Sequence, residues 1–440
     1  MNYRILKLIT VVVFGITISA KIFPQEKKQL SLDESIKIGL ENSNVLHSSK
    51  MNLRYADAKW SEVNTFRLPT LLFSASYTRL SEVDPFTVNT PFGDFNISPA
   101  IFNNYNMKLT LQQPIFTGFK LESNSEIAKL NYLATEQQYN ADQNDLIYNI
   151  KNAYWGLFKA NQIRKVTEEN VALVEAHLKD VRNLFKEGLA TKNDVLKVQV
   201  QLGEAQLGLI DAKNAVRLSN LNLDNVLGIS LSTLIETTDS VNMHLGNSYE
   251  ISVLLEKAYD KRPELKSMDY RVKASEKGIT AAKSDWFPQI YLVGDYNYSR
   301  PNPRILPTQD KFNGTWDVSV SMSLNLWNWG ATIDKTDQAE AQFEQTRDTY
   351  KIFKDRVTLE VTQNFLNVQK SREKMTVSEQ SVNQAEENYR ITNEKFKNGL
   401  ALNSDLLDAE VALLQAKTNF IQSKVDYELA QSQLKKSIGE

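Results

Sequence analysis

A duplicated twelve-residue stretch constrains this chain more than any other feature. The segment 185–196, FKEGLATKNDVL, returns at 396–407 as FKNGLALNSDLL, so the two copies lie 211 residues apart. In each copy a glycine follows a long helical pattern, and glycine ends helices because it adopts positive φ without strain. Thr191 and Asn403 then offer side-chain oxygens that can cap a following helix. Each copy is therefore predicted to be the turn of an antiparallel helical hairpin.

The pattern before each turn predicts an exceptionally long helix. Between 119 and 186 the sequence has no proline and one glycine, and its apolar residues recur every three or four positions. Such a helix is ~100 Å long at 1.5 Å per residue. Helices of this length pack side by side in a coiled-coil manner when they occur in soluble surroundings. The predicted long helices are 119–186 and 331–397, the turns are 187–193 and 398–404, and the returning helices are 192–228 and 404–437.

Ahead of each long helix the apolar period changes from three or four residues to two. Apolar and polar residues alternate there, which predicts strands with one apolar and one polar face. The predicted strands are 70–80, 104–113, 289–299 and 315–327. The segment 82–103 contains three prolines and is predicted to be a loop.

The same order of elements occurs twice, which divides the chain into two structural repeats. Each repeat has short helices, two strands, a long helix, a turn and a returning helix. The repeats are predicted at 26–228 and 251–440, with an irregular polar linker at 229–250. Residues 1–25 have two basic residues followed by a short apolar run, which is typical of a secretory signal peptide. An uncleaved anchor helix is the alternative.

Composition excludes several classes of function. The chain has 51 basic and 53 acidic residues, which does not favour nucleic-acid binding, and it has no cysteine for a disulfide or a thiol nucleophile. Its three histidines, His47, His177 and His244, are scattered, so no metal site is predicted. The sequence contains no phosphate-binding loop and no catalytic constellation. We therefore predict neither an enzyme nor a cofactor.

The four amphipathic strands favour a membrane barrel. A soluble sandwich, with the apolar faces packed together, is the alternative, but it fits poorly beside helices of this length. Four strands cannot close a barrel, and open edges in lipid leave backbone groups without hydrogen bonds. Two copies would give eight strands and a filled interior, whereas three copies give twelve strands and room for a lumen. The helical hairpins of three copies would form a tube below that barrel.

Short motifs at the strand ends point to a known family. Leu68-Pro69 and Phe287-Pro288 precede the strand pairs, and the segments 114–118 (PIFTG) and 326–330 (LWNWG) follow them. With the duplicated turns, these motifs make the chain resemble the TolC-like outer membrane efflux proteins of tripartite pumps and type I secretion over its whole mature length. The resemblance implies a mixed α+β membrane protein, with a twelve-stranded trimeric β-barrel on a periplasmic α-barrel.

The resemblance also implies a location and partners. The chain would lie in the outer membrane of a Gram-negative bacterium as a homotrimer, docked to a periplasmic adaptor protein and an inner-membrane transporter. It would be a passive duct for export. An exported coiled-coil scaffold or adhesin without a pore remains the rival interpretation, and channel conductance would separate the two.

Candidate gate residues lie at the second turn. Asp405 and Asp408 are three residues apart on one helix face, and in a trimer they would form two stacked carboxylate rings that attract cations. They match the family's aspartate pair at the periplasmic entrance. Helix-dipole compensation is the alternative. For Asp194 at the first turn, a capping box with Thr191 is the favoured interpretation.

The best-known member of the family closes its entrance with a tyrosine and an arginine near the turn that corresponds to the second one here. The resemblance places Phe396 and Ala401 at those two positions, so these polar residues are absent. Phe396 is therefore a candidate for an apolar constriction at the entrance, and packing between helices is the alternative.

The tips of the hairpins are small and apolar, and in the family the adaptor docks at these turns. A simple role in turning the chain is the alternative. The residues concerned are Gly188, Leu189, Ala190, Gly399, Leu400 and Ala401.

Overall fold

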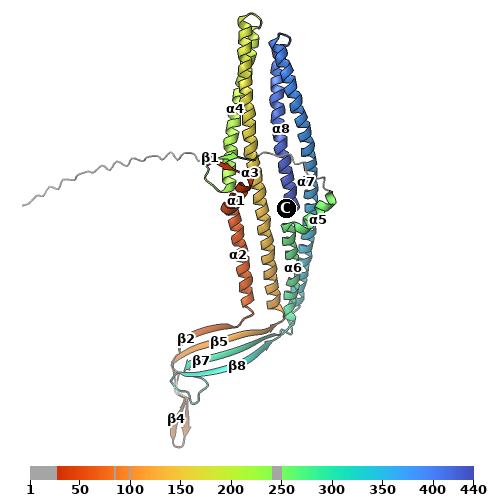
Figure 1. Cartoon of the computed structure of the whole chain (residues 1–440). Helices are drawn as coiled ribbons and strands as arrows, with labels where there is room; N and C mark the ends of the chain where they lie inside the picture. The colour runs from red at the N-terminus through yellow and green to blue at the C-terminus, as the bar shows by residue number, and fades with distance from the viewer. Residues whose placement is uncertain (1–26, 84–85, 99–100, 240–249) are drawn as a thin grey trace, which may run out of the picture.

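A computed structural model describes residues 27–83, 86–98, 101–239 and 250–440. The predicted signal peptide lies outside the described residues. The molecule is elongated, with a β-sheet at one end and two helical hairpins at the other (Figure 1). The helices are α1 (Leu32–Asn42), α2 (Asn44–Thr65), α3 (Lys120–Lys186), α4 (Lys192–Leu227), α5 (Ile251–Lys261), α6 (Pro263–Lys283), the short 3-10 helix η1 (Ser284–Trp286), α7 (Ala331–Lys397) and α8 (Asn403–Ser437).

The main sheet has four antiparallel strands in the order β2-β5-β7-β8. Their bounds are β2 (Thr70–Arg79), β5 (Asn103–Thr117), β7 (Gln289–Arg300) and β8 (Asn313–Ser323). All four predicted strands are present. The last one is shorter than predicted, because the chain leaves the sheet at Ser323 and runs without regular structure to the start of α7.

The register of the sheet gathers the apolar residues on one face. Phe73 is opposite Leu109, Leu109 is opposite Tyr296, and Tyr296 is opposite Trp316. The other face is polar, and there Asp295 accepts a hydrogen bond from Thr110 at 2.6 Å and forms an ion pair with Lys108 at 2.9 Å. The apolar face is exposed along β2 and β8, as the period-two pattern predicted for a membrane strand.

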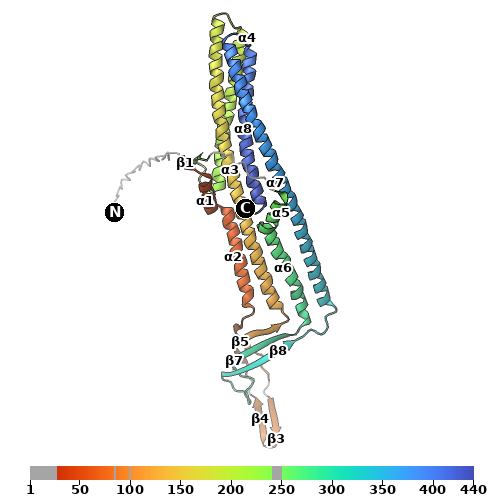
Figure 2. The ribbon, with the colours of Figure 1, turned by 45° about the vertical axis from the view of Figure 1, so that its right-hand side comes forward.

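Two further strand pairs were not predicted. β3 (Phe86–Thr90) and β4 (Gly93–Ser98) form an antiparallel hairpin beyond the sheet, so the prediction of a loop over 82–103 was wrong (Figure 2). β1 (Lys27–Leu30) and β6 (Leu234–Thr237) pair in parallel at mid-height; β6 lies in the linker that was predicted to be irregular, and β1 precedes the first helix of the first repeat. Each of these strands has only four to six residues, too few for an alternation to be read against prolines or polar neighbours.

The long helices α3 and α7 each have 67 residues and run unbroken from the sheet to the tips. The other helices divide the same length between them: α2 with α4, and α6 with α8 (Figure 1). The dividing points are equivalent in the two repeats. Gly228 and Gly439 have positive φ there, and an added Cβ would lie 2.9 Å from the backbone of Asn42 or 2.8 Å from that of Lys261. Only glycine fits both the turn and the close approach.

Apolar side chains form three clusters along the body. The first two lie at mid-height in equivalent places: Ile150 and Leu227 in the first repeat correspond to Val361 and Ile438 in the second, each 211 residues later. The third cluster lies near the tips and joins the two hairpins. The core is thus a row of separate clusters between helices, as expected for a wall one helix thick.

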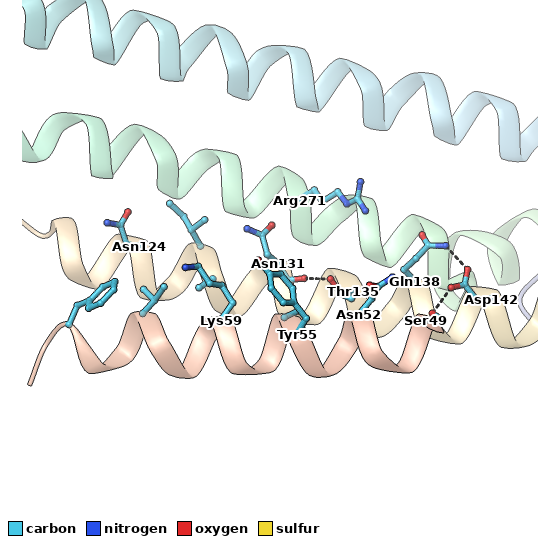
Figure 3. A pocket seen from close by; sticks show the side chains of 15 residues that line it. Ser49, Asn52, Tyr55, Lys59, Asn124, Asn131, Thr135, Gln138, Asp142 and Arg271 are labelled. Atoms are coloured by element: carbon cyan, nitrogen blue, oxygen red, sulfur yellow. Dashed lines mark hydrogen bonds between the residues drawn. The ribbon is translucent and has the colours of Figure 1, made fainter. Parts of the chain in front are cut away.

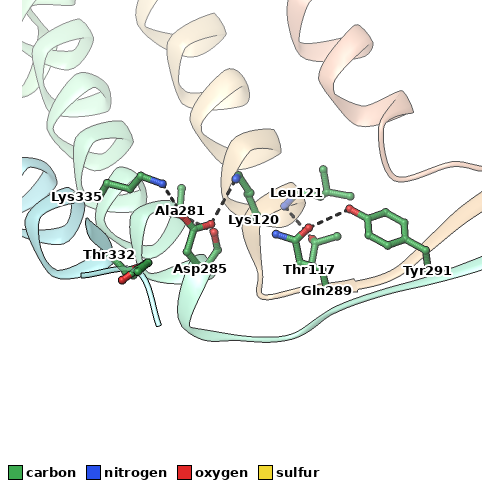
Figure 4. Close-up of polar contacts among 11 residues, drawn as sticks. Thr117, Lys120, Leu121, Ala281, Asp285, Gln289, Tyr291, Thr332 and Lys335 are labelled. Atoms are coloured by element: carbon green, nitrogen blue, oxygen red, sulfur yellow. Dashed lines mark hydrogen bonds and ion pairs between the residues drawn. The ribbon is translucent and has the colours of Figure 1, made fainter. Parts of the chain in front are cut away.

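The strand-to-helix junction is held by one carboxylate and by aromatic contacts. Asp285 in η1 lies 2.7 Å from the ammonium of Lys335 in α7 and 3.7 Å from that of Lys120 in α3 (Figure 4). The hydrogen bond from Lys335 holds the pKa of Asp285 below its usual value. Phe119 packs edge-on against Phe287, with ring centroids 5.8 Å apart. This contact fixes where the long helices leave the sheet.

A groove of about 690 Å³ lies between α2, α3 and α6 (Figure 3). Asp142 is the single carboxylate among the residues that line the groove, and it accepts hydrogen bonds from Ser49 at 2.5 Å and from Gln138 at 2.9 Å. The remaining lining is mixed, with Tyr55 and Arg271 among its side chains. The groove therefore offers no free carboxylate. Among the described residues, no helix combines the length and apolarity needed to cross a membrane.

Candidate functional site at the helical tips

The two turns end their long helices in the same way. Gly188 and Gly399 have φ of 76° and 70°, and the following residues Leu189 and Leu400 donate back to the helix with N–O distances of 2.8 Å. This is the Schellman arrangement that glycine favours. Both leucines are exposed, whereas Ala190 and Ala401 are partly buried against the cluster near the tips. Each turn therefore presents one leucine outward at the end of the molecule.

The helix after the first turn begins with a complete capping box. The Thr191 hydroxyl accepts from the Asp194 amide at 3.2 Å, and the Asp194 carboxylate accepts from the Thr191 amide at 2.9 Å. The Thr191 hydroxyl also donates to the Asp194 carboxylate at 2.6 Å, and this hydrogen bond, followed by the one from the Thr191 amide, lowers the pKa of Asp194. The capping interpretation accounts for Asp194 fully.

The second turn has only half of that box. The residue at the N-cap is Leu402, which has no side-chain acceptor, and the Asp405 carboxylate accepts from its amide at 3.1 Å. The prediction that Asn403 caps this helix was wrong. Asn403 is the first helical residue, and its buried side-chain nitrogen and oxygen have no hydrogen-bond partner among the described residues.

The structure places the candidate carboxylates Asp405 and Asp408 together. Both are exposed on α8, on the side away from the buried Leu406. In the described part of the chain Asp408 forms no hydrogen bond or ion pair, so capping does not account for it. A free carboxylate at this place can attract cations in front of the tip.

Phe396 lies inside the protein. It is 8% exposed and belongs to the cluster near the tips, together with Val181, Val198 and Leu406 from three other helices. In this conformation it packs between the hairpins, as the alternative interpretation proposed, and does not face an opening. Its ring stands edge-on to that of His177, with centroids 5.2 Å apart.

A buried ionisable pair joins the two hairpins behind Phe396. His177 of α3 is 4% exposed and Glu410 of α8 is 2% exposed. Nδ1 of His177 lies 3.1 Å from Oε1 of Glu410, but neither ring nitrogen of His177 nor Oε2 of Glu410 forms a hydrogen bond of good geometry among the described residues. Nearby, burial raises the pKa of Tyr389, and the charges of Glu410 and Asp180 add to the rise. The pair is the main polar contact within an apolar cluster.

Sequence reasoning did not identify this pair. A signal exists in retrospect, because each residue occupies an apolar position of its helix: His177 lies between Val174 and Val181, and Glu410 between Leu406 and Leu413. A polar residue in an apolar stripe indicates a buried polar contact. The partner could not be named, since it lies on another helix more than 200 residues away.

Comparison with known proteins identifies the family. The model of the family described as "Outer membrane efflux protein" matches residues 36–229 and 254–440. The chain is 25% identical over 379 residues to the alkaline protease secretion protein AprF of Pseudomonas aeruginosa, covering 84% of this chain and 76% of the relative. It is 26% identical over 306 residues to the outer membrane protein TolC of Vibrio cholerae, covering 69% of this chain and 70% of the relative.

Solved structures show the same fold. CusC superposes with a TM-score of 0.79 at 17% identity, covering 93% of this chain and 92% of that one. The Vibrio cholerae outer membrane protein VceC superposes with a TM-score of 0.78 at 18% identity, covering 93% and 96%. The family match spans most of the chain, and its two segments coincide with the two repeats. The chain belongs to the outer membrane efflux protein family and is an export channel of the Gram-negative outer membrane.

Proposed function

We propose that three copies of this chain form a passive duct through the outer membrane, which works with a periplasmic adaptor and an inner-membrane transporter. The single observation that carries the proposal is an unequal coverage of two equivalent helices. Trp155 of α3 is 4% exposed, whereas Leu366, its equivalent in α7, is 54% exposed. The same contrast separates buried Ala141 from exposed Ile352.

The reason for this contrast is the position of the two helices. α3 lies between helices of both repeats, since it contacts α2 and α4 on one side and α6 and α8 on the other. α7 contacts α5, α6 and α8 of its own repeat, and its other side is open. The exposed stripe of α7 continues through Leu359. An apolar stripe of this length in an exported protein requires a cover, and α2 and α4 of a second copy would supply it.

The sheet has the same unfinished edges. β5 pairs on both sides, with β2 and with β7, whereas its equivalent β8 pairs with β7 alone among the strands of the described residues. β2 of a second copy would complete β8 as β7 completes β5. Joining edge to edge leaves no strand unpaired only if the ring closes, which lipid demands. Three copies give twelve strands and an open lumen.

Aromatic residues at both ends of the sheet support a membrane position. Tyr77 and Tyr105 stand 5.0 Å apart at the end away from the helices, and Trp327 and Trp329 stand 5.8 Å apart at the helical end. Tyrosine and tryptophan gather at the two interfaces of a bilayer. The apolar band between these aromatic groups would face lipid.

At the other end of the duct, Asp405 and Asp408 would form carboxylate rings at the periplasmic entrance. Three copies bring three exposed pairs around one axis, and stacked like charges attract cations and repel anions. Asp194 would serve the helix cap and Phe396 would close the contact between the hairpins. This assigns the electrostatic part of the entrance to the second repeat alone, because the residue equivalent to Asp408 is Lys197.

The exposed tips would be the docking surface for the adaptor. Leu189 and Leu400 project beyond the last helical turn, and the space around Gly188 and Gly399 is open. A helical hairpin of a partner could approach the backbone closely at such small residues. Gly399→Trp should abolish export while leaving the oligomer intact, and normal export by that variant would contradict docking at the tips.

Single-channel conductance in planar bilayers tests the duct itself. The purified oligomer should conduct, and Asp405→Asn/Asp408→Asn should reduce its preference for cations without changing its oligomeric state. Glu373→Gln, an exposed charge on α7 away from the turn, is a matched control and should leave the preference unchanged. A stable oligomer without conductance would favour a scaffold or an adhesin.

A further inference from the structure

The internal repeat makes a residue-level prediction about the contact between copies. Within one chain the two repeats meet where α3 of the first contacts α8 of the second. In the second repeat α7 takes the place of α3, and in the first repeat α4 takes the place of α8. If the ring closes as proposed above, α7 of one copy therefore contacts α4 of the next in the same way.

The contact within the chain contains three side chains that define its centre. The buried ring of His177 is held between the Glu410 carboxylate, at 3.1 Å, and the Phe396 ring. All three are less than a tenth exposed. The contact is therefore closed in a single chain and needs no second copy.

A shift of 211 residues converts this contact into its equivalent between copies. His177 becomes Asn388, Glu410 becomes Gln199 and Phe396 becomes Phe185. All three equivalents are exposed in the single chain, and Phe185 is 43% exposed where Phe396 is 8%. The phenylalanine is retained and the ionisable pair is replaced by two amides.

We propose that Asn388 of one copy pairs with Gln199 of the partner subunit, against Phe185 of the partner subunit. This inference rests on the homotrimer proposed above. A belt of six polar pairs would then surround the tube behind the tips. Three His177–Glu410 pairs lie within chains, and they alternate with three amide pairs between chains.

The difference between the two kinds of pair has a physical reason. His177 and Glu410 are buried together as the chain folds, so their contact is made before a second copy arrives. Asn388 and Gln199 are in water until a second copy arrives, and assembly must remove that water. Desolvating an amide costs far less free energy than desolvating an ion. Two amides can donate and accept at once, and so satisfy one another without charge. Neutral residues therefore suit the contact that forms last.

Cross-linking tests the pair directly, because the chain has no cysteine. The full-length variant Asn388→Cys/Gln199→Cys is purified in detergent and treated with a short bifunctional thiol reagent that spans the replaced side chains. We expect covalent species of two and three chains on a denaturing gel. Both positions are exposed in the single chain, so neither substitution disturbs its core.

A matched control uses the opposite side of the same helix. Arg390 lies two residues after Asn388 and is also exposed. The variant Arg390→Cys/Gln199→Cys should yield single chains only, because two residues turn an α-helix by about 200°. Oligomeric state is measured on the same samples before the reagent is added.

The outcomes separate this inference from the proposed function. A trimer that cross-links through Arg390 and not through Asn388 would overturn the pairing and leave the duct intact. A lone subunit in every sample would overturn both.

Charge substitutions supply a second measurement without reagent. Asn388→Glu/Gln199→Glu should lower the temperature at which the oligomer dissociates, whereas Asn388→Glu/Gln199→Lys should restore it. Equal dissociation temperatures for the two variants would contradict the pairing, because opposite and like charges differ only when the side chains are close.

Discussion

The returning helices α4 and α8 are equivalent in the two repeats, but they pack against different neighbours. α8 lies against α3 and α7, and its Leu429 packs on the first mid-height cluster. α4 lies against α3 and leaves the equivalent Leu218 exposed, together with Ile210. The residue types follow this difference: the covered helix α8 has a buried carboxyl group, Glu410, where the open helix α4 has the exposed amide of Gln199. The residue types at equivalent positions of the repeat therefore differ between contacts that form as the chain folds and contacts that would form on assembly.

Charged residues on the exposed apolar face of α4 should have the largest effect. Ile210→Glu/Leu218→Glu should leave a folded single chain and abolish the trimer, because both side chains become buried only on assembly. Native mass spectrometry and circular dichroism measure the two effects separately. Lys213→Glu, beside the stripe, should assemble normally. By contrast Leu429→Glu should impair folding itself, and a well-folded monomer from that variant would remove the distinction.

The buried pair gives the next largest effect. Removing one partner, as in Glu410→Ala, should destabilise the helical body by about 3–5 kcal/mol, because the other buried polar group loses its partner. His177→Asn/Glu410→Gln copies the amide pair of the other contact into this one and should cost markedly less. Thermal unfolding of the helical signal measures both. An equal loss in the two variants would show that charge itself is needed.

A pH effect distinguishes the ends of the same two helices. Burial raises the pKa of Asp224 at the end of α4 to about 6, and its equivalent in α8 is Lys435. A raised carboxyl pKa means that the folded state binds the proton more tightly, so stability falls as pH rises from about 4 to about 6 and stays low above it.

Asp224→Asn should remove that loss. The expected gain is about 2–3 kcal/mol at pH 7 and close to zero at pH 4, from ~1.4 kcal/mol per unit of pKa shift. Denaturant unfolding at the two pH values measures it. A gain that is the same at both values would mean that the carboxyl keeps its ordinary pKa.

The smallest effect compares the two turns. Thr191→Ala removes the hydroxyl from a complete capping box and should destabilise its hairpin by about 1–2 kcal/mol, although the amide of residue 191 still donates to Asp194. Asn403→Ala removes a buried amide that has no partner among the described residues, and should be neutral or slightly stabilising. Hydrogen exchange of the first turn of each helix is the measurement. Comparable losses would show that Asn403 is hydrogen-bonded in the assembled protein.

The long helices, the turns at Gly188 and Gly399 and the four strands of the main sheet could be predicted from the sequence, because helix stops, periods and strand alternation are local signals. The same reasoning missed β1 and β6, whose pairing joins short segments about 200 residues apart. It missed the His177–Glu410 pair for the same reason. At Asn403 it looked for a side chain that can cap the helix, whereas the offset of 211 residues from Thr191 leads to Leu402, which is the N-cap. Contacts between distant segments are decided by packing, which no single window of sequence contains.

The glycine joints at mid-height have a mechanical consequence. Gly228 and Gly439 lie where α4 and α8 end at mid-height, while α3 and α7 pass the same level without interruption. The continuous helix beside each interruption supports it, and long helices bend gradually along their length and not at a single point. If the tips of the proposed duct move apart, we therefore expect the bending to be distributed along α3 and α7 and to leave the strands of the sheet little changed.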